Sequence, residues 1–328
     1  MTIGEPAIDG CPKRMTYGPC GGVDDDGGCE VDARPCPFVD VVVPPPPGAT
    51  KRPRPYPLGP ILIDLRIPAD DHELDEIAGL FGSVGGAALI GEHVDDPVEA
   101  APHRHAERLA AAGVPSLVTV TGRDRSRNEH AAEIDRLVTT GVGAVHCVTG
   151  DHPSVRLGPE ATATFTMDGT ELAALARATG ALVSVCESPS AHPIERRADR
   201  LVTKQIAGAD MAVLNHCGSP TAAIQFADRC RSSGVDLALV APVPVITDHA
   251  SAHALAQFPG LVLPDGLVER ILTADDPHAS GVDAAIEIGE ELLASGRFAA
   301  INLSGSATTG GPVARARTMI EVAHGATS

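Results

Sequence analysis

From residue 61 onward the sequence repeats one pattern about eight times: a short apolar run, bounded by polar residues or glycine, and then a longer amphipathic stretch. Continuously apolar runs are typical of strands buried on both faces, as in a parallel sheet covered by helices. Eight strand–helix units predict a closed (β/α)8 TIM barrel, in the α/β class, more readily than an open sheet. The expected strands are 61–66, 87–91, 116–121, 144–149, 181–186, 211–215, 237–241 and 299–303.

The stretches that follow the strands carry the period of a helix. Ala-Gly pairs such as Ala207-Gly208 are placed to end a helix before the next strand. An open doubly wound sheet is the alternative fold, but no Gly-x-Gly-x-x-Gly follows the first strand, so the usual dinucleotide-binding motif is missing. The clearest helical stretches, with apolar residues three and four apart, are 170–179, 195–207, 221–233 and 282–295.

Composition divides the chain into three parts. Residues 1–43 are rich in Gly, Cys and Asp and show little apolar periodicity, so we expect a small module that needs a metal ion to fold. Residues 44–60 are rich in proline and predict an extended, semi-rigid linker. Residues 61–328 are the expected catalytic barrel domain.

The formal net charge of −18 argues against a non-specific grip on nucleic acid or anionic lipid, because both need clustered Lys and Arg. The N-terminus lacks the basic start and apolar core of a signal peptide, and no later run is long enough to span a bilayer. We therefore expect a cytoplasmic protein with neither nucleic acid nor membrane as partner. We also expect a homo-oligomer, because barrels of this kind often pair. Aromatic residues are only 2% of the chain, so few rings are available to stack on a flavin or pterin.

Four cysteines, Cys11, Cys20, Cys29 and Cys36, crowd into the N-terminal module. In a cytosolic protein, such crowding indicates a metal site rather than disulfides. Four thiolates suit a tetrahedral Zn²⁺ ion or a [4Fe-4S] cluster, and the spacing does not choose between them. Unligated surface thiols are the third alternative.

Polar residues follow the predicted strands at the point where each strand ends. In a TIM barrel the active site lies at this C-terminal face, so these residues are candidates whatever the family. Any one of them can instead be a helix cap or a solvated loop residue. The set is Asp64, Glu92, Arg123 with Asp124, Asp151 with His152, Glu187, Asn215 with His216, Asp248 with His249, and Asn302 with Ser304.

Several of these motifs resemble the methylenetetrahydrofolate reductase family. The strings Cys-Pro-Lys-Arg and Gly-Pro-Cys-Gly-Gly, around Cys11 and Cys20, are similar to the cysteine module that accompanies many bacterial members as a partner subunit or fused domain. In the barrel, Thr-Gly-Arg-Asp-Arg-Ser-Arg at 121–127, Val-Thr-Gly-Asp-His-Pro at 148–153 and Lys-Gln-Ile-Ala-Gly-Ala-Asp at 204–210 resemble further family motifs. The resemblance covers nearly the whole chain in consistent order.

The resemblance implies an oxidoreductase of one-carbon metabolism that moves a hydride from NAD(P)H, normally through a bound flavin, to the methylene carbon of 5,10-methylenetetrahydrofolate. Asp64 matches the family acid at the end of strand one, where Glu is usual. Asp151 matches an Asp whose charge stabilises the iminium cation. Asn215 falls where a substrate-binding Gln is expected, and we place Glu92 and His216 beside it as substrate-binding residues.

A family flavin, FAD, would be expected near six residues. The sequence departs from the family pattern at three positions: Thr149 replaces an Arg, Thr119 a His and Ser188 a Tyr. The resemblance therefore leaves both flavin-dependent and flavin-free hydride transfer open. The residues expected at the cofactor are Thr121, Arg123, Thr149, Gly150, His192 and Lys204.

Two other functions remain open at the level of sequence. One is a non-redox folate-binding or electron-transfer subunit that works with a separate catalytic or redox partner protein, which the shortened acids would allow. The other is a metal-dependent hydrolase or lyase that uses His152, His216 and His249, which needs at least two of these histidines to meet on one ion.

Overall fold

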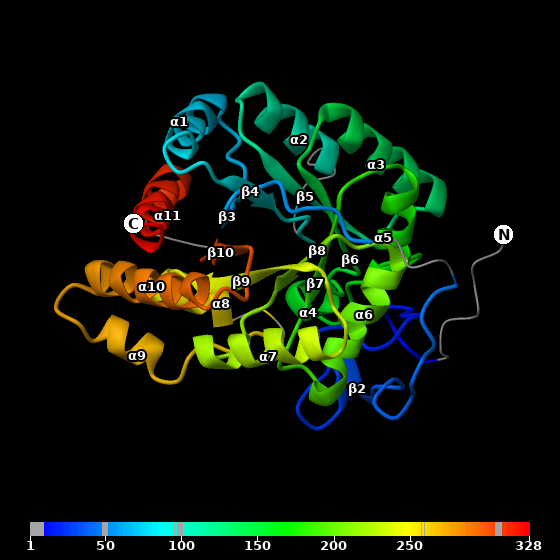
Figure 1. The fold of residues 1–328 in the computed structure, drawn as a ribbon. Helices are drawn as coiled ribbons and strands as arrows, with labels where there is room; N and C mark the ends of the chain where they lie inside the picture. The colour runs from blue at the N-terminus through cyan, green and yellow to red at the C-terminus, as the bar shows by residue number, and fades with distance from the viewer. Residues whose placement is uncertain are drawn as a thin grey trace.

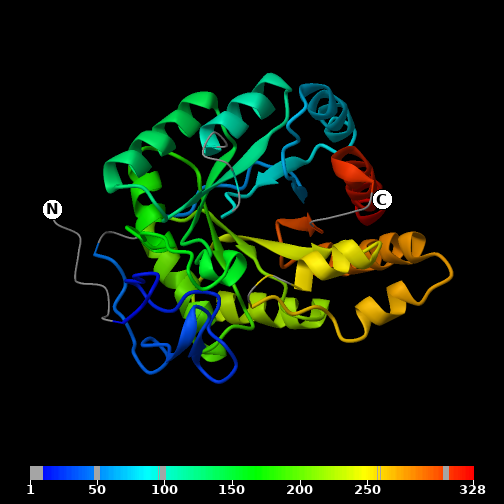
Figure 2. The same ribbon diagram turned by 180° about the vertical axis from the view of Figure 1, so that it is seen from behind.

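The computed structural model describes residues 10–47, 52–94, 96, 101–256, 258, 260–305 and 310–328. Eight parallel strands close into a barrel in the order β10-β3-β4-β5-β6-β7-β8-β9. Helices surround the barrel (Figures 1 and 2). The predicted TIM barrel is confirmed. Its strands are β3 (Ile61–Asp64), β4 (Ala87–Ile90), β5 (Ser116–Thr121), β6 (Ala144–Val148), β7 (Val183–Glu187), β8 (Met211–Leu214), β9 (Ala238–Pro244) and β10 (Ala300–Ser304).

The helices follow the strands as the periodicity predicted. Left-handed Gly208, with φ of 117°, ends α6 directly after Ala207, as expected from an Ala-Gly pair. None of the helices in the described ranges is long and apolar enough to cross a bilayer. The helices are α1 (Asp71–Phe81), α2 (Pro102–Ala111), α3 (Arg127–Thr140), α4 (Ser154–Leu157), α5 (Gly169–Ala178), the 3₁₀ helix η1 (Ile194–Arg196), α6 (Arg197–Ala207), α7 (Pro220–Ser232), α8 (His249–Ala256), α9 (Leu267–Leu272), α10 (Pro277–Ala294) and α11 (Gly311–Ala326).

Strand β9 runs further than the sequence indicated. The expected strand ended at residue 241, whereas β9 continues through Pro242 to Pro244, although proline has no N–H to give to a ladder. In the structure both prolines are paired with β10. Pairing with β8 ends at Val240. Beyond Val240, the edge of β9 that faces β8 makes no ladder hydrogen bonds that a proline could remove.

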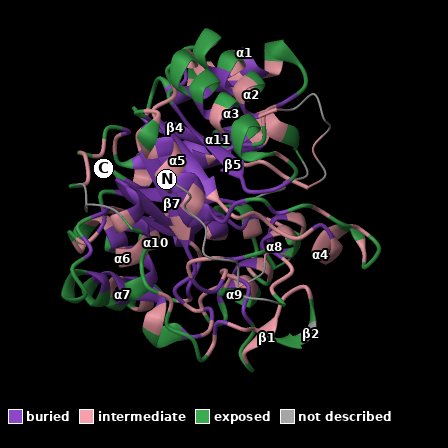
Figure 3. Ribbon diagram, turned by 90° about the vertical axis from the view of Figure 1, so that its right-hand side faces the viewer, coloured by how far each residue is buried: buried purple, intermediate pink, exposed green. Residues whose placement is uncertain are grey.

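The core has two layers. Apolar side chains fill the space between the strands and the surrounding helices, and a second cluster fills the inside of the barrel. Leu62, Leu117, Met211 and Val240 belong to this inner cluster and are almost fully buried. The strands accordingly form a continuous buried centre in Figure 3. The inner cluster closes the lower part of the barrel and leaves the C-terminal ends of the strands to carry polar residues.

In the N-terminal module, β1 (Gly28–Cys29) and β2 (Asp32–Pro35) form a small antiparallel hairpin, drawn in blue beside the barrel in Figures 1 and 2. The linker is fixed to the barrel at Arg54. The backbone N–H of Arg54 donates to Asp210 Oδ1 at 2.8 Å, and its Nη1 donates to the carbonyl of Gly180 at 3.0 Å. Arg177 of α5 donates to the same Asp210 carboxylate.

Asp210 is the fully buried anchor of the linker, so Asp210→Ala is expected to cost about 3–5 kcal/mol of unfolding free energy. The substitution leaves Arg177 and the Val183 N–H without their acceptor. Burial opposes ionisation of Asp210, but the hydrogen bonds from Arg54 outweigh it and lower the Asp210 pKa. The difference from wild type should therefore be full at pH 7 and shrink as the pH falls below about 4.

Urea unfolding at several pH values measures this difference. The exposed Asp283→Ala on α10 is the matched control and should stay within about 0.5 kcal/mol of wild type. An equal effect of both variants would contradict the assigned role of Asp210.

Candidate active site

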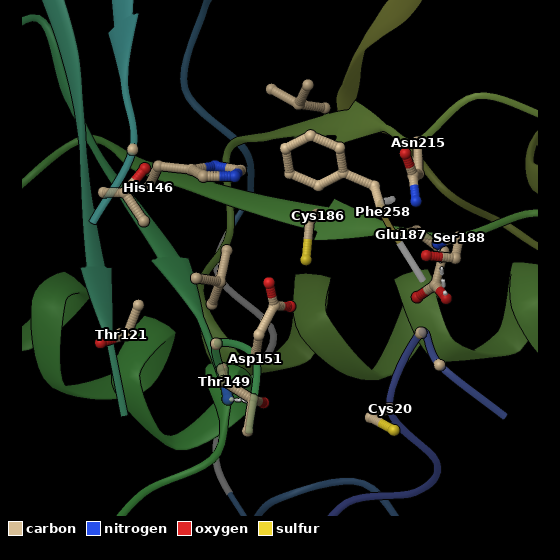
Figure 4. A pocket seen from close by; sticks show the side chains of 18 of the residues that line it. Cys20, Thr121, His146, Thr149, Asp151, Cys186, Glu187, Ser188, Asn215 and Phe258 are labelled. Atoms are coloured by element: carbon tan, nitrogen blue, oxygen red, sulfur yellow. Dashed lines mark hydrogen bonds between the residues drawn. The ribbon is translucent and has the colours of Figure 1, made fainter. Parts of the chain in front are cut away.

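A cavity of about 340 Å³ opens at the C-terminal ends of the barrel strands. That volume lies within the range of small-molecule sites. Its floor includes His146 together with Leu89 and Val213, which belong to the apolar inner cluster. One wall is made by the N-terminal segment, through residues that include Lys13 and Cys20, and Figure 4 shows Cys20 on this wall. The cavity is therefore built from the strand ends of the barrel and from the module that precedes it.

Asp64 ends β3 and lines the cavity, with 30% of its side chain exposed. Buried Arg315 of α11 lies behind it: one guanidinium nitrogen donates to the Asp64 carbonyl and stands 3.9 Å from Oδ2. Asp64 and Ser304 follow the paired residues Ile63 and Leu303, so closure of the barrel sets them side by side. The predicted acid position thus lies at the seam between the first and last strands.

Asp151 follows β6 and lines the same cavity. Its Oδ2 lies 3.2 Å from an Arg156 guanidinium nitrogen, and the Arg156 guanidinium stacks 4.5 Å from the centre of the Phe258 ring. Figure 4 shows Asp151, Cys186 and Phe258 around a common space. Phe258 is a site residue that sequence reasoning missed, because its loop carries no motif and only the fold brings it over the barrel mouth.

Glu92, Thr121 and Arg123 form a connected group at the ends of β4 and β5. Glu92 Oε2 accepts from the backbone N–H and hydroxyl of Thr121, at 2.7 and 2.8 Å. Arg123 is buried and donates to the carbonyls of Asp151 and Glu92. These contacts hold two loops in place, so the guanidinium of Arg123 is already used within the protein.

Two buried histidines line the cavity in the neutral form. His216 shares a 2.6 Å hydrogen bond with Ser304, and His146 shares one of 2.9 Å with Ser184. Burial lowers the pKa of each imidazole to about 4. Asn215 Oδ1 accepts from the backbone N–H of His216 at 2.9 Å. His216 and Asn215 therefore reach the cavity as predicted, but neither histidine is an acid at neutral pH.

Asn302 of β10 is a further cavity residue with an unused acceptor. It is 6% exposed, and its Oδ1 has no hydrogen-bond partner within the described structure. A buried carbonyl oxygen without a partner is costly. It is therefore placed to accept a hydrogen bond from a bound ligand.

Lys204 is paired inside the protein. Its ammonium lies 2.7 Å from Glu187 Oε2 and also donates to the Cys186 carbonyl, while Arg197 lies 3.2 Å from Glu187 Oε1. Burial opposes ionisation of Glu187, but Lys204 and then Arg197 outweigh it and lower the Glu187 pKa. Lys204 and Glu187 thus form a compensated ion pair at the cavity wall.

The remaining predicted cofactor residues are Gly150, Thr149 and His192, and two of them line the cavity. Gly150 adopts φ of 87°, and a Cβ there would stand 3.0 Å from Thr121. Thr149 Oγ1 accepts from the Gly169 N–H at 3.0 Å and contacts Met15 Sδ at 3.5 Å. The His192 N–H donates to the Val23 carbonyl at 3.4 Å. Gly150 and Thr149 line the cavity, whereas His192 serves as an attachment point of the N-terminal segment.

The four N-terminal cysteines are free thiols. Burial raises the pKa of Cys11 and of Cys36, and the charge of the nearby Cys29 raises both further. Cys20 instead faces Glu30, 3.8 Å from its Oε1. Within the described ranges, no three His, Cys, Asp or Glu residues are arranged to hold a metal ion. The metal predicted at the four cysteines therefore stays a prediction, and the described residues form no metal group of His152, His216 and His249.

The fold resembles known barrels at low sequence identity. One is an uncharacterized protein from Clostridium thermocellum that binds two copies of 5-methyl-5,6,7,8-tetrahydrofolic acid; it is 13% identical, with a TM-score of 0.56 over 82% of this chain and 94% of that one. Another is 2,3-dimethylmalate lyase, 16% identical, with a TM-score of 0.46 over 79% of this chain and 80% of that one. No curated protein matches the sequence.

Two family profiles match the sequence. Residues 3–43 match the family described as methylene-tetrahydrofolate reductase C terminal, although the segment stands at the N-terminus here. Residues 98–309, more than half of the chain, match the family described as methylenetetrahydrofolate reductase. The chain therefore belongs to the methylenetetrahydrofolate reductase family.

Proposed function

We propose that this chain reduces a C1–tetrahydrofolate adduct, 5,10-methylenetetrahydrofolate or a close relative, with a reduced nicotinamide as the electron source. The observation that carries the proposal is that Asp64 and Asp151, the two carboxylates that match the family motifs, line one cavity at the barrel mouth. Family membership supports an oxidoreductase, and the 5-methyltetrahydrofolate bound by a barrel of similar fold supports a folate ligand.

The proposed reaction consumes one proton and one hydride. A proton added to a ring nitrogen of the adduct opens the five-membered ring and leaves an iminium at the methylene carbon. The hydride then forms a C–H bond at that carbon, giving a methyl group, while the nicotinamide is oxidised. The protein must therefore supply an acid and stabilise a transient cation.

Asp64 is the proposed acid. Neutral His146 and His216 have no proton to give as imidazolium at pH 7, because burial holds both pKa values at about 4. The carboxylate that remains after proton transfer faces the buried guanidinium of Arg315, 3.9 Å away. Arg315 thus stabilises the charge that the step creates on Asp64.

Asp151 is the proposed partner of the iminium. Its carboxylate reaches the cavity from β6, on another side of the barrel from β3. Arg156 and Lys13 lie nearby and orient the carboxylate toward the cavity wall. Phe258 offers its ring to the flat pterin, and Asn302 Oδ1 offers an acceptor to its amino group.

Asp64→Asn is expected to lower kcat by about 10²–10⁴-fold and to leave folate binding unchanged, because the amide keeps the shape but cannot donate the proton. Steady-state kinetics and folate titration measure the two effects. Asp64→Glu, which restores the usual family residue, should keep substantial activity. The exposed Asp75→Asn on α1 is the surface control.

Full activity of Asp64→Asn would remove Asp64 from the mechanism. If the wild-type chain binds folate but shows no turnover with any reduced nicotinamide, the function is instead that of a folate-binding or electron-transfer subunit. Turnover by the purified single chain excludes that alternative.

Asn302→Ala is expected to weaken folate binding about fivefold to tenfold, the value of one net hydrogen bond. The matched control is Asn128→Ala on α3, an exposed position outside the cavity lining. Equal folate affinities for Asn302→Ala and wild type, measured by isothermal titration calorimetry, would show that the unpaired oxygen does not meet the ligand.

The metal predicted from the four cysteines stays a separate proposal, and no step of the reaction above depends on it. Elemental analysis of anaerobically purified protein should find one zinc, or the four irons and sulfides of one cluster, per chain. Cys29→Ser should lower this content, whereas Cys217→Ala, in a barrel position outside the module, should not. Metal-free protein with four reactive thiols would refute the proposal.

A further inference from the structure

The N-terminal segment, defined as residues 10–23, lies across one side of the barrel mouth. Its residues Lys13, Met15, Pro19, Cys20 and Gly21 line the cavity together with the strand ends. Figure 4 shows Cys20 on this segment, below Glu187 and Ser188 of the barrel. The segment is therefore part of the wall of the site.

Buried charged groups of the barrel hold the backbone of this segment. Asp168, the fully buried N-cap of α5, accepts from the backbone N–H groups of Thr16 and Tyr17 at 2.9 and 3.0 Å. Arg197 donates to the Cys20 carbonyl at 2.9 Å, and Arg200 donates to the Tyr17 carbonyl. Charge-assisted bonds from buried groups are strong, so the segment is seated in a site built for it.

Two departures from the family's flavin pattern touch this segment. Thr149, which stands for an Arg, contacts Met15 Sδ at 3.5 Å. Ser188, which stands for a Tyr, lies so close to Gly21 that a Cβ on Gly21 would meet Ser188 Oγ at 2.4 Å. A larger side chain at either position would occupy the space that the segment fills.

The other residues expected at the flavin are already engaged. Lys204 forms an ion pair with Glu187, and the Arg123 guanidinium donates hydrogen bonds to two backbone carbonyls. The backbone N–H of His192 donates to the Val23 carbonyl of the segment, and His192 does not line the cavity. The residues present therefore do not fit a flavin, because the expected phosphate-binding groups have partners and the small side chains adjoin the segment.

We infer that residues 10–23 form a built-in plug that takes the place of the flavin, so that the chain binds no flavin and passes a hydride directly from a reduced nicotinamide to the folate. The direct hydride transfer rests on the proposed function, whereas the plug and the absence of flavin do not. In the direct step the C4–H bond of the dihydronicotinamide breaks with its electron pair, and a C–H bond forms at the iminium carbon. The oxidised nicotinamide then leaves.

Flavin binding tests the plug without any assay of activity. The full chain, purified and then incubated with excess FAD, should hold no stoichiometric flavin after gel filtration, as read from absorbance and from the fluorescence of the denatured supernatant. One tightly bound flavin per chain would overturn the inference.

Limited proteolysis tests whether the segment is seated. In wild type, trypsin should cleave slowly after Arg14, because the backbone that follows it is held within the plug although the Arg14 side chain is exposed. Ser188→Tyr, which restores the family residue, should speed cleavage after Arg14 by about tenfold by displacing Gly21. The exposed Ser233→Tyr at the C-terminal end of α7 is the control, and circular dichroism checks that the barrel of each variant folds. Equal cleavage after Arg14 in wild type and Ser188→Tyr would refute the plug.

Isotope transfer tests the direct step. With a nicotinamide deuterated at the transferred position of C4, the product methyl group should carry the deuterium in full, and reaction in D₂O with unlabelled nicotinamide should place none there. Deuterium taken from solvent would reveal an exchangeable carrier and overturn direct transfer. If no reductase turnover is found, the proposed function fails, while flavin binding and proteolysis still decide the plug.

Discussion

Closure of the sheet between β10 and β3 is the constraint on which the site depends. The pairing of Ile301 with Ile61 and of Leu303 with Ile63 joins the first and last strands of the barrel. It brings Asp64 to the side of Ser304, and α11 then places Arg315 behind Asp64. A parallel barrel collects the C-terminal ends of all its strands at one mouth, so one closure assembles side chains that are far apart in the chain.

The mouth is lined with charged groups that compensate one another. Lys204 and Arg197 neutralise Glu187, and Glu30 partners Lys13. Burial opposes the charge of Lys13, but Glu30 outweighs burial and raises its pKa. Buried charges without partners would cost several kcal/mol each. The charged groups of the wall formed by the N-terminal segment therefore have partners, whereas the Asn302 Oδ1 atom has none within the described structure.

Much of the fold could be predicted from the sequence. The continuous apolar runs located all eight strands, and the structure moved their ends by only a few residues. The largest shift is in β9, which continues through Pro242 and Pro244, and the barrel accommodates both prolines where β8 no longer pairs. The site was harder. The rule that site residues follow barrel strands identified Asp64, Asp151 and His216. It did not indicate that Arg123 would donate to backbone carbonyls or that Phe258 would line the cavity.

The sequence by itself determined the eight-strand barrel, the family, and the set of polar residues at the strand ends, because hydrophobic period and local motifs are properties of neighbouring residues. The tertiary structure alone decided which of those residues have partners. Lys204 is not free for a ligand, because it forms an ion pair with Glu187. The space beside the small side chain of Ser188 is filled by Gly21, more than 160 positions earlier in the chain. Such pairings are contacts between distant parts of the chain, and only folding brings them together.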